Sequence, residues 1–194
     1  AFELYPDDIE RMITAKVGGG ESLEPLDFAT FSRISKQVKV EFGVDVILYS
    51  QQLDDGVYVA TRNAQVKLPD DPFEDLQPMA AQVKSINLWR RKLSAEAFAV
   101  LGQFSQLAEL HLNESNVTTS DLNALRELRK LQTLNLFGTE IGDDAVQTLG
   151  SIRSLRTLHL NDSQFTAAGV GALKQALPRC EILHNSQGSA AETE

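Results

Sequence analysis

Four segments that begin 24 residues apart decide the fold: VKSINLWRRKLS (83–94), LAELHLNESNVT (107–118), LQTLNLFGTEIG (131–142) and LRTLHLNDSQFT (155–166). Apolar residues occupy positions 1, 4, 6 and 11 of every segment. Apolar residues separated by single polar ones are typical of a short strand with one buried face. A fifth, partial unit, CEIL, begins at Cys180. The pattern therefore predicts parallel strands near Ile86, Leu110, Leu134 and Leu158.

The second half of each repeat carries three more apolar columns, one of which is Leu101, Leu125, Leu149 and Leu173. Their spacing predicts a helix that is entered through a bend. Residues that favour helix starts stand just before these columns: Ser94, Thr118, Thr166, and either Asp143 or Asp144. One strand and one helix cannot bury an apolar face alone, so stacked units must share a core between a parallel sheet and a row of helices.

The combination of L-x-x-L-x-L with a helical second half resembles the leucine-rich repeat family, in its bacterial 24-residue form, over about residues 83–183. The resemblance implies an α/β fold: a right-handed solenoid with a parallel concave sheet and convex helices. Many members carry Asn at the ninth position, where this chain has Arg91, Ser115, Thr139 and Ser163. We expect the three hydroxyls to bond the turn backbone. Arg91 makes the first repeat atypical.

The chain divides into three predicted parts: a small α+β region over 1–68, the solenoid with its N-terminal cap over 69–184, and a disordered tail over 185–194. In the first part, Val44–Tyr49 and Val57–Thr61 read as two strands of a hairpin with Asp55-Gly56 in the turn. Gly18–Gly20 reads as a linker. Phe73, Leu76 and Met79 are expected to cover the first apolar end of the solenoid.

The composition excludes several classes of protein. Hydrophobic residues make up 42% and charged residues 23% of the 194, which is ordinary for a folded chain. No apolar run is long enough to span a membrane, and the single Cys180 rules out an intrachain disulfide. The net charge of −9 argues against a nucleic-acid partner. Residues 1–82 carry 15 of the 27 acids and 7 of the 18 bases, so most of the excess negative charge lies there.

Candidate binding residues stand at positions 3, 5, 7 and 8 of the repeats, which strand pleating and the following turn place on the concave face, the side of the sheet opposite the buried leucines. They are Trp89, Arg90, Glu109, His111, Asn113, Asn135, Phe137, His159, Asn161 and Asp162. Aromatic side chains dominate protein interfaces, so these columns favour a protein or peptide partner. The alternative is that Trp89 and Phe137 pack against the cap or a neighbouring repeat.

Enzymatic and metal chemistry find little support in the sequence. His111 and His159 are separated by two strand spacings of ~4.8 Å, too far for ready convergence on one zinc ion. The chain lacks G-x-S-x-G, H-E-x-x-H and phosphate-loop motifs. Cys180, at an apolar column, is expected to be a buried thiol. We expect a non-enzymatic interaction module without cofactor or metal. The alternative is a small-ligand receptor or an enzyme whose activity lies in residues 1–82.

Charged residues are also expected to form two opposed rims. Bases fall just before or at the strand starts: Lys84, Arg129, Lys130, Arg153, Arg156 and Arg179. Acids fall after the strands: Glu114, Glu140, Asp143, Asp144 and Asp162, interrupted by Arg90, Arg91 and Lys92. Such rims either orient a polar partner or form an ordinary solvated surface of mixed charge.

Overall fold

The structure is a computed structural model that describes residues 44–48, 57–61 and 80–185, together with positions 33, 36 and 76. The predicted Gly18–Gly20 linker, the Asp55-Gly56 turn, Phe73, Met79 and residues 186–194 of the predicted tail lie outside the described residues. The boundaries between the three predicted parts stay a prediction.

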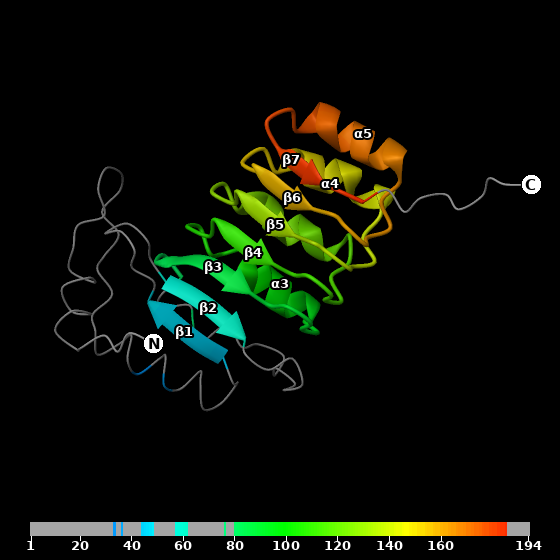
Figure 1. Cartoon of the computed structure of the whole chain (residues 1–194). Helices are drawn as coiled ribbons and strands as arrows, with labels where there is room; N and C mark the ends of the chain where they lie inside the picture. Colours follow the sequence, from blue (N-terminus) through cyan, green and yellow to red (C-terminus); the bar gives the residue numbers. More distant parts are fainter. Residues whose placement is uncertain are drawn as a thin grey trace, which may run out of the picture.

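One seven-stranded sheet runs through the described chain in sequence order (Figure 1). Its strands are β1 (Val44–Leu48), β2 (Val57–Thr61), β3 (Val83–Asn87), β4 (Glu109–His111), β5 (Thr133–Asn135), β6 (Thr157–His159) and β7 (Glu181–Leu183). The five strands from β3 to β7 pair in parallel. Each pairing sets the same repeat position side by side, as Leu110 with Leu134 and Leu134 with Leu158. The predicted parallel strands are confirmed.

The predicted hairpin is also present. β1 and β2 pair antiparallel, with Val44 opposite Thr61 and Leu48 opposite Val57. β2 then pairs in parallel with β3, with a register irregularity between Val57 and Tyr58. The hairpin therefore extends the sheet of the repeats by two strands.

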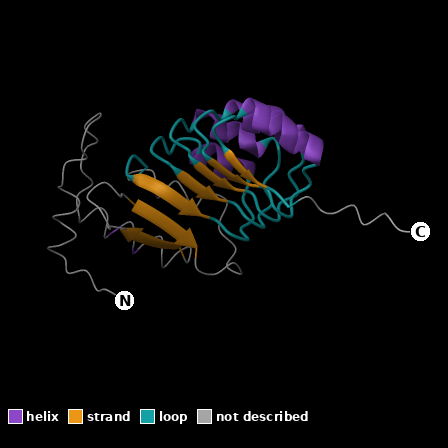
Figure 2. Ribbon diagram, turned by 45° about the horizontal axis from the view of Figure 1, so that its top comes forward, coloured by secondary structure: helices purple, strands orange, loops and turns teal. Residues whose placement is uncertain are grey.

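Helical segments cover one side of the repeat sheet and leave the other side to the strands (Figure 2). They are α3 (Ala95–Leu101), the 3₁₀ helix η2 (Asp121–Glu127), the short 3₁₀ turn η3 (Asp143–Ala145), α4 (Val146–Ser151) and α5 (Ala167–Ala176). Every full repeat thus has the predicted helical half, but in the second repeat it is a 3₁₀ helix. Its start carries a reciprocal pair: Asp121 accepts from the backbone N–H of Thr118 at 2.9 Å, and the Thr118 hydroxyl accepts from the N–H of Asp121 at 3.4 Å.

The predicted α-helix caps hold in the first and fourth repeats and fail in the third. Ser94 accepts from the N–H of Ala97 at 3.2 Å, and Thr166 accepts from the N–H of Gly169 at 3.2 Å. In the third repeat Gly142 stands at the cap position, without a side chain to bond. Asp143 instead reaches the next repeat, accepting from the N–H and hydroxyl of Thr166 at 2.9 and 2.5 Å. These bonds lower the pKa of Asp143.

The Thr166 hydroxyl therefore both caps α5 and joins two repeats. Thr166→Ala is expected to reduce the free energy of unfolding by ~1 kcal/mol, the usual loss for an N-cap side chain. Thr166→Ser, which keeps the hydroxyl, is the matched control and should stay within a few tenths of the parent in chemical denaturation. A serine variant as unstable as the alanine variant would show that the methyl group, not the cap, stabilises this site.

The core is a continuous stack of apolar side chains between the sheet and the helices. Positions 4 and 6 are fully buried in all four repeats: Ile86, Leu88, Leu110, Leu112, Leu134, Leu136, Leu158 and Leu160. Leu76, one of the three residues expected to cover the first end of the solenoid, joins this core with 1% exposure. Burial on this scale is the main favourable term for the fold.

The ninth column shows a partial ladder. Thr139 and Ser163 donate their hydroxyls to the carbonyls of Leu136 and Leu160 at 2.7 and 2.6 Å, as predicted. The Ser115 hydroxyl is buried without a partner among the described residues, so the prediction is wrong there.

Arg91 is 2% exposed and lies within the fold. The expectation that Arg91 interrupts a charged rim at the surface is therefore wrong, and burial lowers the pKa of its guanidinium.

Candidate functional site

The concave face is built by the alternation of buried and accessible residues along each short strand. In β4, Glu109 and His111 are half-buried while Leu110 between them is fully buried. β5 and β6 repeat this pattern, which places Thr133, Asn135, Thr157 and His159 on the same side as Glu109 and His111. Figure 2 shows that the helices lie on the opposite side of these strands. The structure thus aligns the predicted third and fifth positions on one surface.

The seventh column continues this surface beyond the strand ends. Trp89 is 41% exposed and is the one exposed large hydrophobic side chain among the residues that the structure describes. Asn113, Phe137 and Asn161 are half-buried. The two aromatic rings therefore differ: the fold partly covers Phe137, whereas Trp89 presents a large accessible face.

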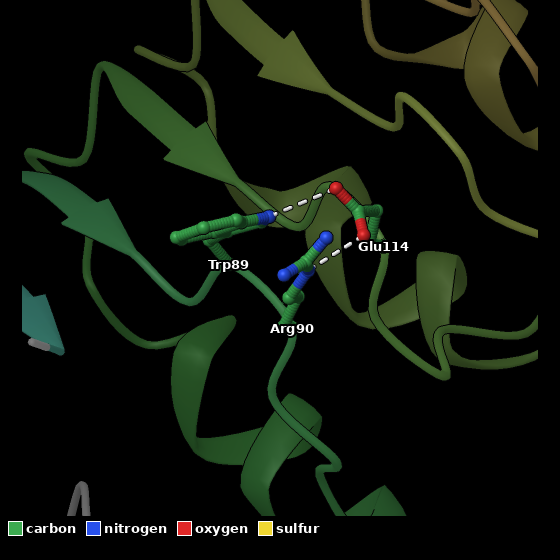
Figure 3. A network of polar contacts seen from close by, with 3 residues as sticks. All are labelled: Trp89, Arg90 and Glu114. Atoms are coloured by element: carbon green, nitrogen blue, oxygen red, sulfur yellow. Dashed lines mark hydrogen bonds and ion pairs between the residues drawn. The ribbon is translucent and has the colours of Figure 1, made fainter. Parts of the chain in front are cut away.

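Trp89 belongs to a polar network at one end of the surface (Figure 3). Its indole Nε1–H donates to Glu114 Oε1 at 3.1 Å, and Arg90 Nε donates to Glu114 Oε2 at 2.6 Å. The Arg90 guanidinium lies 4.6 Å from the centre of the Trp89 ring, within cation–π range. The hydrogen bonds from Arg90 and Trp89 lower the pKa of the Glu114 carboxyl. Together these contacts orient the Trp89 ring.

The eighth column forms the turns that follow the strands. Arg90, Glu114 and Asp162 have φ of 57°, 55° and 55°, and Gly138 has φ of 63°. A left-handed residue at this place, followed by a backbone bond from position 9 to position 6, closes each turn. Only the glycine adopts this conformation without strain. The sequence pattern did not reveal that charged residues adopt this left-handed conformation in the other three repeats.

Asp162 is engaged within the fold at the C-terminal end of the surface. Its carboxylate accepts from the Asn185 amide at 2.7 Å, and Asn185 Oδ1 accepts from the backbone N–H of Asp162 at 2.8 Å. The predicted site residue at this end is therefore tied to the last described residue. The repeat pattern did not point to Asn185, because it lies beyond the last complete repeat.

The fifth column alternates amides and imidazoles: Asn87, His111, Asn135 and His159. His111 Nε2 lies 4.0 Å from Glu109 Oε2. Burial lowers the pKa of His111, Glu109 opposes this change, and His159 adds to it through charge repulsion. Burial therefore favours the uncharged form of His111, an imidazole with one donor and one acceptor nitrogen.

Cys180 is half-buried against the core rather than fully enclosed, and partial burial raises the pKa of its thiol.

Within the described residues no three potential metal ligands cluster together. None of the described helices is long and apolar enough to cross a membrane. Both of the predicted charged rims carry exposed charges. On the basic rim, Arg129 lies 3.9 Å from the carboxylate of Glu127.

Strands that repeat every 24 residues, helices on one side and an open sheet face on the other define an α/β solenoid. Two adjacent stretches, residues 127–150 and 151–174, match the family model described as Leucine Rich repeat. These two units are therefore leucine-rich repeats, and the units that begin at Val83 and Leu107 share their 24-residue pattern. No curated protein matches the sequence significantly.

Three solved structures illustrate the range of similar folds. An internalin from Listeria monocytogenes is 25% identical over 58% of this chain, with a TM-score of 0.45. A leucine-rich-repeat protein of Leptospira interrogans is 18% identical over 56%, with a TM-score of 0.44. The ectodomain of an Arabidopsis thaliana receptor kinase is 14% identical over 83% of this chain and 93% of its own, with a TM-score of 0.48. This chain spans 31% of the internalin and 26% of the Leptospira protein.

Proposed function

We propose that this chain is a non-enzymatic interaction module that binds a protein or peptide through the concave face of its repeats. The observation that carries the proposal is the open sheet face, on which Trp89 remains 41% exposed beside a row of amide and imidazole side chains. An exposed aromatic ring of this size is typical of interface hot spots. Leucine-rich repeats commonly serve as protein-interaction modules, which agrees with this proposal.

The chemistry of the face favours a polypeptide over other ligands. Asparagine and histidine side chains donate and accept hydrogen bonds, which suits the mixed donors and acceptors of a peptide backbone. The half-buried Phe137 and exposed Trp89 offer apolar contact on the same side. An open row of short strands gives many such contacts without enclosing a small molecule.

The test begins with selection of binders from a phage-displayed library of random peptides against the intact chain. Enriched peptides are then synthesised and titrated by calorimetry. The proposal expects at least one peptide family whose binding depends on residues of the concave face. Enrichment only of peptides that bind equally well when that face is altered would reject the proposal.

Phe137→Ala is the variant that measures this dependence. It is expected to weaken the selected peptide by at least ~1 kcal/mol, about a fivefold rise in Kd, because an aromatic contact is removed from the interface. Gln175→Ala, an exposed change on α5, is the control on the other side of the solenoid. Trp89→Ala should act in the same direction as Phe137→Ala.

Thermal melts of the same variants distinguish contact from packing. We expect the melting temperatures of Phe137→Ala and Trp89→Ala to stay close to that of the parent. A large fall in melting temperature would show that the rings pack within the fold. Unchanged affinity in both variants would place the binding surface elsewhere, with the acidic N-terminal region as the next region to test.

A further inference from the structure

The turns that follow the first three repeat strands form one continuous surface. The N–H of Arg90 donates to the Asn113 carbonyl at 3.0 Å. The N–H of Glu114 donates to the Phe137 carbonyl at 2.7 Å. These bonds carry the parallel register of the strands into the turns. A Cβ atom at Gly138 would lie 3.0 Å from Glu114 Cγ, so the glycine leaves room for the Glu114 side chain.

Two of these turns carry charged residues in a backbone conformation that favours glycine. Arg90 and Glu114 have φ of 57° and 55°, whereas the third turn has Gly138 at 63°. Backbone strain of this kind is often retained at binding sites, where the strained residue is needed for its side chain. Both side chains take part in one network, because Glu114 accepts from Arg90 Nε and from Trp89 Nε1. The strain thus accompanies the contacts that orient the Trp89 ring.

The network leaves hydrogen-bond donors and an aromatic ring for a partner. Both carboxylate oxygens of Glu114 are engaged, and the carboxylate balances the charge of Arg90 at 2.6 Å. Among the described residues, no acceptor contacts the two terminal NH₂ groups of Arg90, whose side chain is 52% exposed. The Trp89 ring stays accessible although Arg90 lies over it. Neutral carbonyl oxygens and apolar rings complement this arrangement, because a partner carboxylate would lie beside Glu114.

The spacing of the two aromatic rings favours one backbone conformation in the partner. Trp89 and Phe137 stand at the seventh position of repeats that have one repeat between them, so two strand spacings, about 9.6 Å, separate their backbones. A polyproline II helix has three residues per turn and presents every third side chain on one side, at intervals of about 9.3 Å. A β-strand presents alternate side chains at intervals of about 6.8 Å, which does not match the rings.

We propose that Trp89, Arg90 and Phe137 bind a proline-rich segment of the partner, which lies across the strands in the polyproline II conformation. Prolines three residues apart pack on the two rings, and Arg90 donates to main-chain carbonyls of the segment. These carbonyls are free because the polyproline II helix has no internal hydrogen bonds. Proline also lacks an N–H, so the segment brings few donors that need an acceptor.

Glu114 is a positioning residue in this site. It fixes Trp89 and Arg90 before the segment binds, and such preorganisation lowers the cost of binding. The inference rests on the proposed function, because it specifies the kind of peptide that the concave face accepts.

The probe for this site is a capped decaproline peptide, with a capped Gly-Ser peptide of ten residues as the comparison. Trp89 is the only tryptophan of the 194 residues, so tryptophan fluorescence reports on the site directly. Titration of the full chain with decaproline should change the emission and reach saturation. The Gly-Ser peptide should leave the emission unchanged, because it has no rings and loses more backbone freedom on binding.

Arg90→Lys and Phe137→Ala measure the two kinds of contact. Lysine keeps the charge but loses the planar fork of donors, so decaproline should bind at least about fivefold more weakly. Phe137→Ala should have an effect of similar size, because only one ring remains for the segment. Arg126→Lys makes the same exchange on η2, among the helical segments on the other side of the sheet, and should change Kd less than twofold.

Arg90→Gly separates binding from folding. Glycine adopts the left-handed conformation without strain, so this variant should melt no lower than the parent. Its affinity for decaproline should nevertheless fall at least about fivefold, because the donors are gone. A glycine variant that melts well below the parent and still binds decaproline normally would give Arg90 a structural role only.

The outcomes distinguish this inference from the proposed function. Decaproline binding that survives both Arg90→Lys and Phe137→Ala would place the peptide elsewhere and overturn this site. Absence of a response to decaproline, with library peptides that still depend on Phe137, would overturn the proline-rich segment and leave the proposed function standing. Library peptides that ignore the concave face would reject both.

Discussion

Leu134→Ala is expected to lower the free energy of unfolding by about 2–5 kcal/mol, the range for a large-to-small change in a packed core. Leu134 is fully buried in β5, and its strand pairs with β4 on one side and β6 on the other. Both neighbouring repeats are held by their own core residues, so the site has little freedom to collapse around the cavity. The measurement is urea denaturation followed by circular dichroism.

Thr166→Ala is the comparison for this result, since its expected loss in free energy of unfolding is only ~1 kcal/mol. Both variants delete part of a side chain, but only Leu134→Ala opens a cavity in the shared core. Equal losses for the two variants would show that the middle repeat is not packed as described. A loss at Leu134 below about 1 kcal/mol would contradict its place in the core directly.

Gly102→Ala is expected to destabilise the fold by about 1–3 kcal/mol through overpacking. A Cβ atom at Gly102 would lie 2.5 Å from the backbone carbonyl oxygen of Ala124 in the next repeat. A backbone carbonyl cannot rotate aside like the end of a long side chain, so the two repeats must separate slightly. Gly102 has φ of −60°, and its requirement is therefore for space rather than for an unusual backbone conformation.

Gly171→Ala is the matched control for this clash. A Cβ atom at Gly171, within α5, would meet no atom within 4 Å. Alanine restricts the unfolded chain and favours the helix, so this variant should be about 0.4–1 kcal/mol more stable than the parent. Thermal melts should therefore move in opposite directions for the two substitutions. A stabilising Gly102→Ala would show that the close approach of the first two repeats does not exist in solution.

The repeat fold was predictable because its information is local and periodic. The alternation in LAELHLNESNVT alone predicts a strand, and its recurrence every 24 residues predicts parallel stacking. Ser94 and Thr166 were predictable as caps for the same reason, since a cap acts within one turn of its own helix. These features require no knowledge of which residues meet across repeats.

Contacts between repeats were harder to predict. Asp143 resembles a helix cap by position, yet it bonds Thr166 in the following repeat, a choice that only the spacing of adjacent turns determines. Arg91 looks like a surface base in sequence, but the register places it inside the turn column. The strained backbone at Arg90 and Glu114 follows from the turn that all repeats share, not from the preference of either residue.

The candidate site was predictable in outline but not in its hydrogen bonds. Strand alternation alone is enough to place His111, Asn135 and Phe137 on the concave face. The orientation of the Asn135 amide depends on a hydrogen bond to the Phe137 backbone. The orientation of the Trp89 ring depends on a hydrogen bond to Glu114 in the next repeat. Such bonds determine which groups remain for a partner, and they depend on distances between repeats that a linear pattern does not contain.

The central claim is that the concave face binds the partner, and mapping of amide signals in an isotope-labelled chain tests it most directly. A peptide selected from the random library is added, and shifted amide signals are assigned along the repeats. The account predicts that the largest changes cluster in β3–β6 and the turns after them, around Trp89, Asn113, Phe137 and Asn161. Changes concentrated on α3, α4 and α5, with the strand signals unmoved, would contradict it.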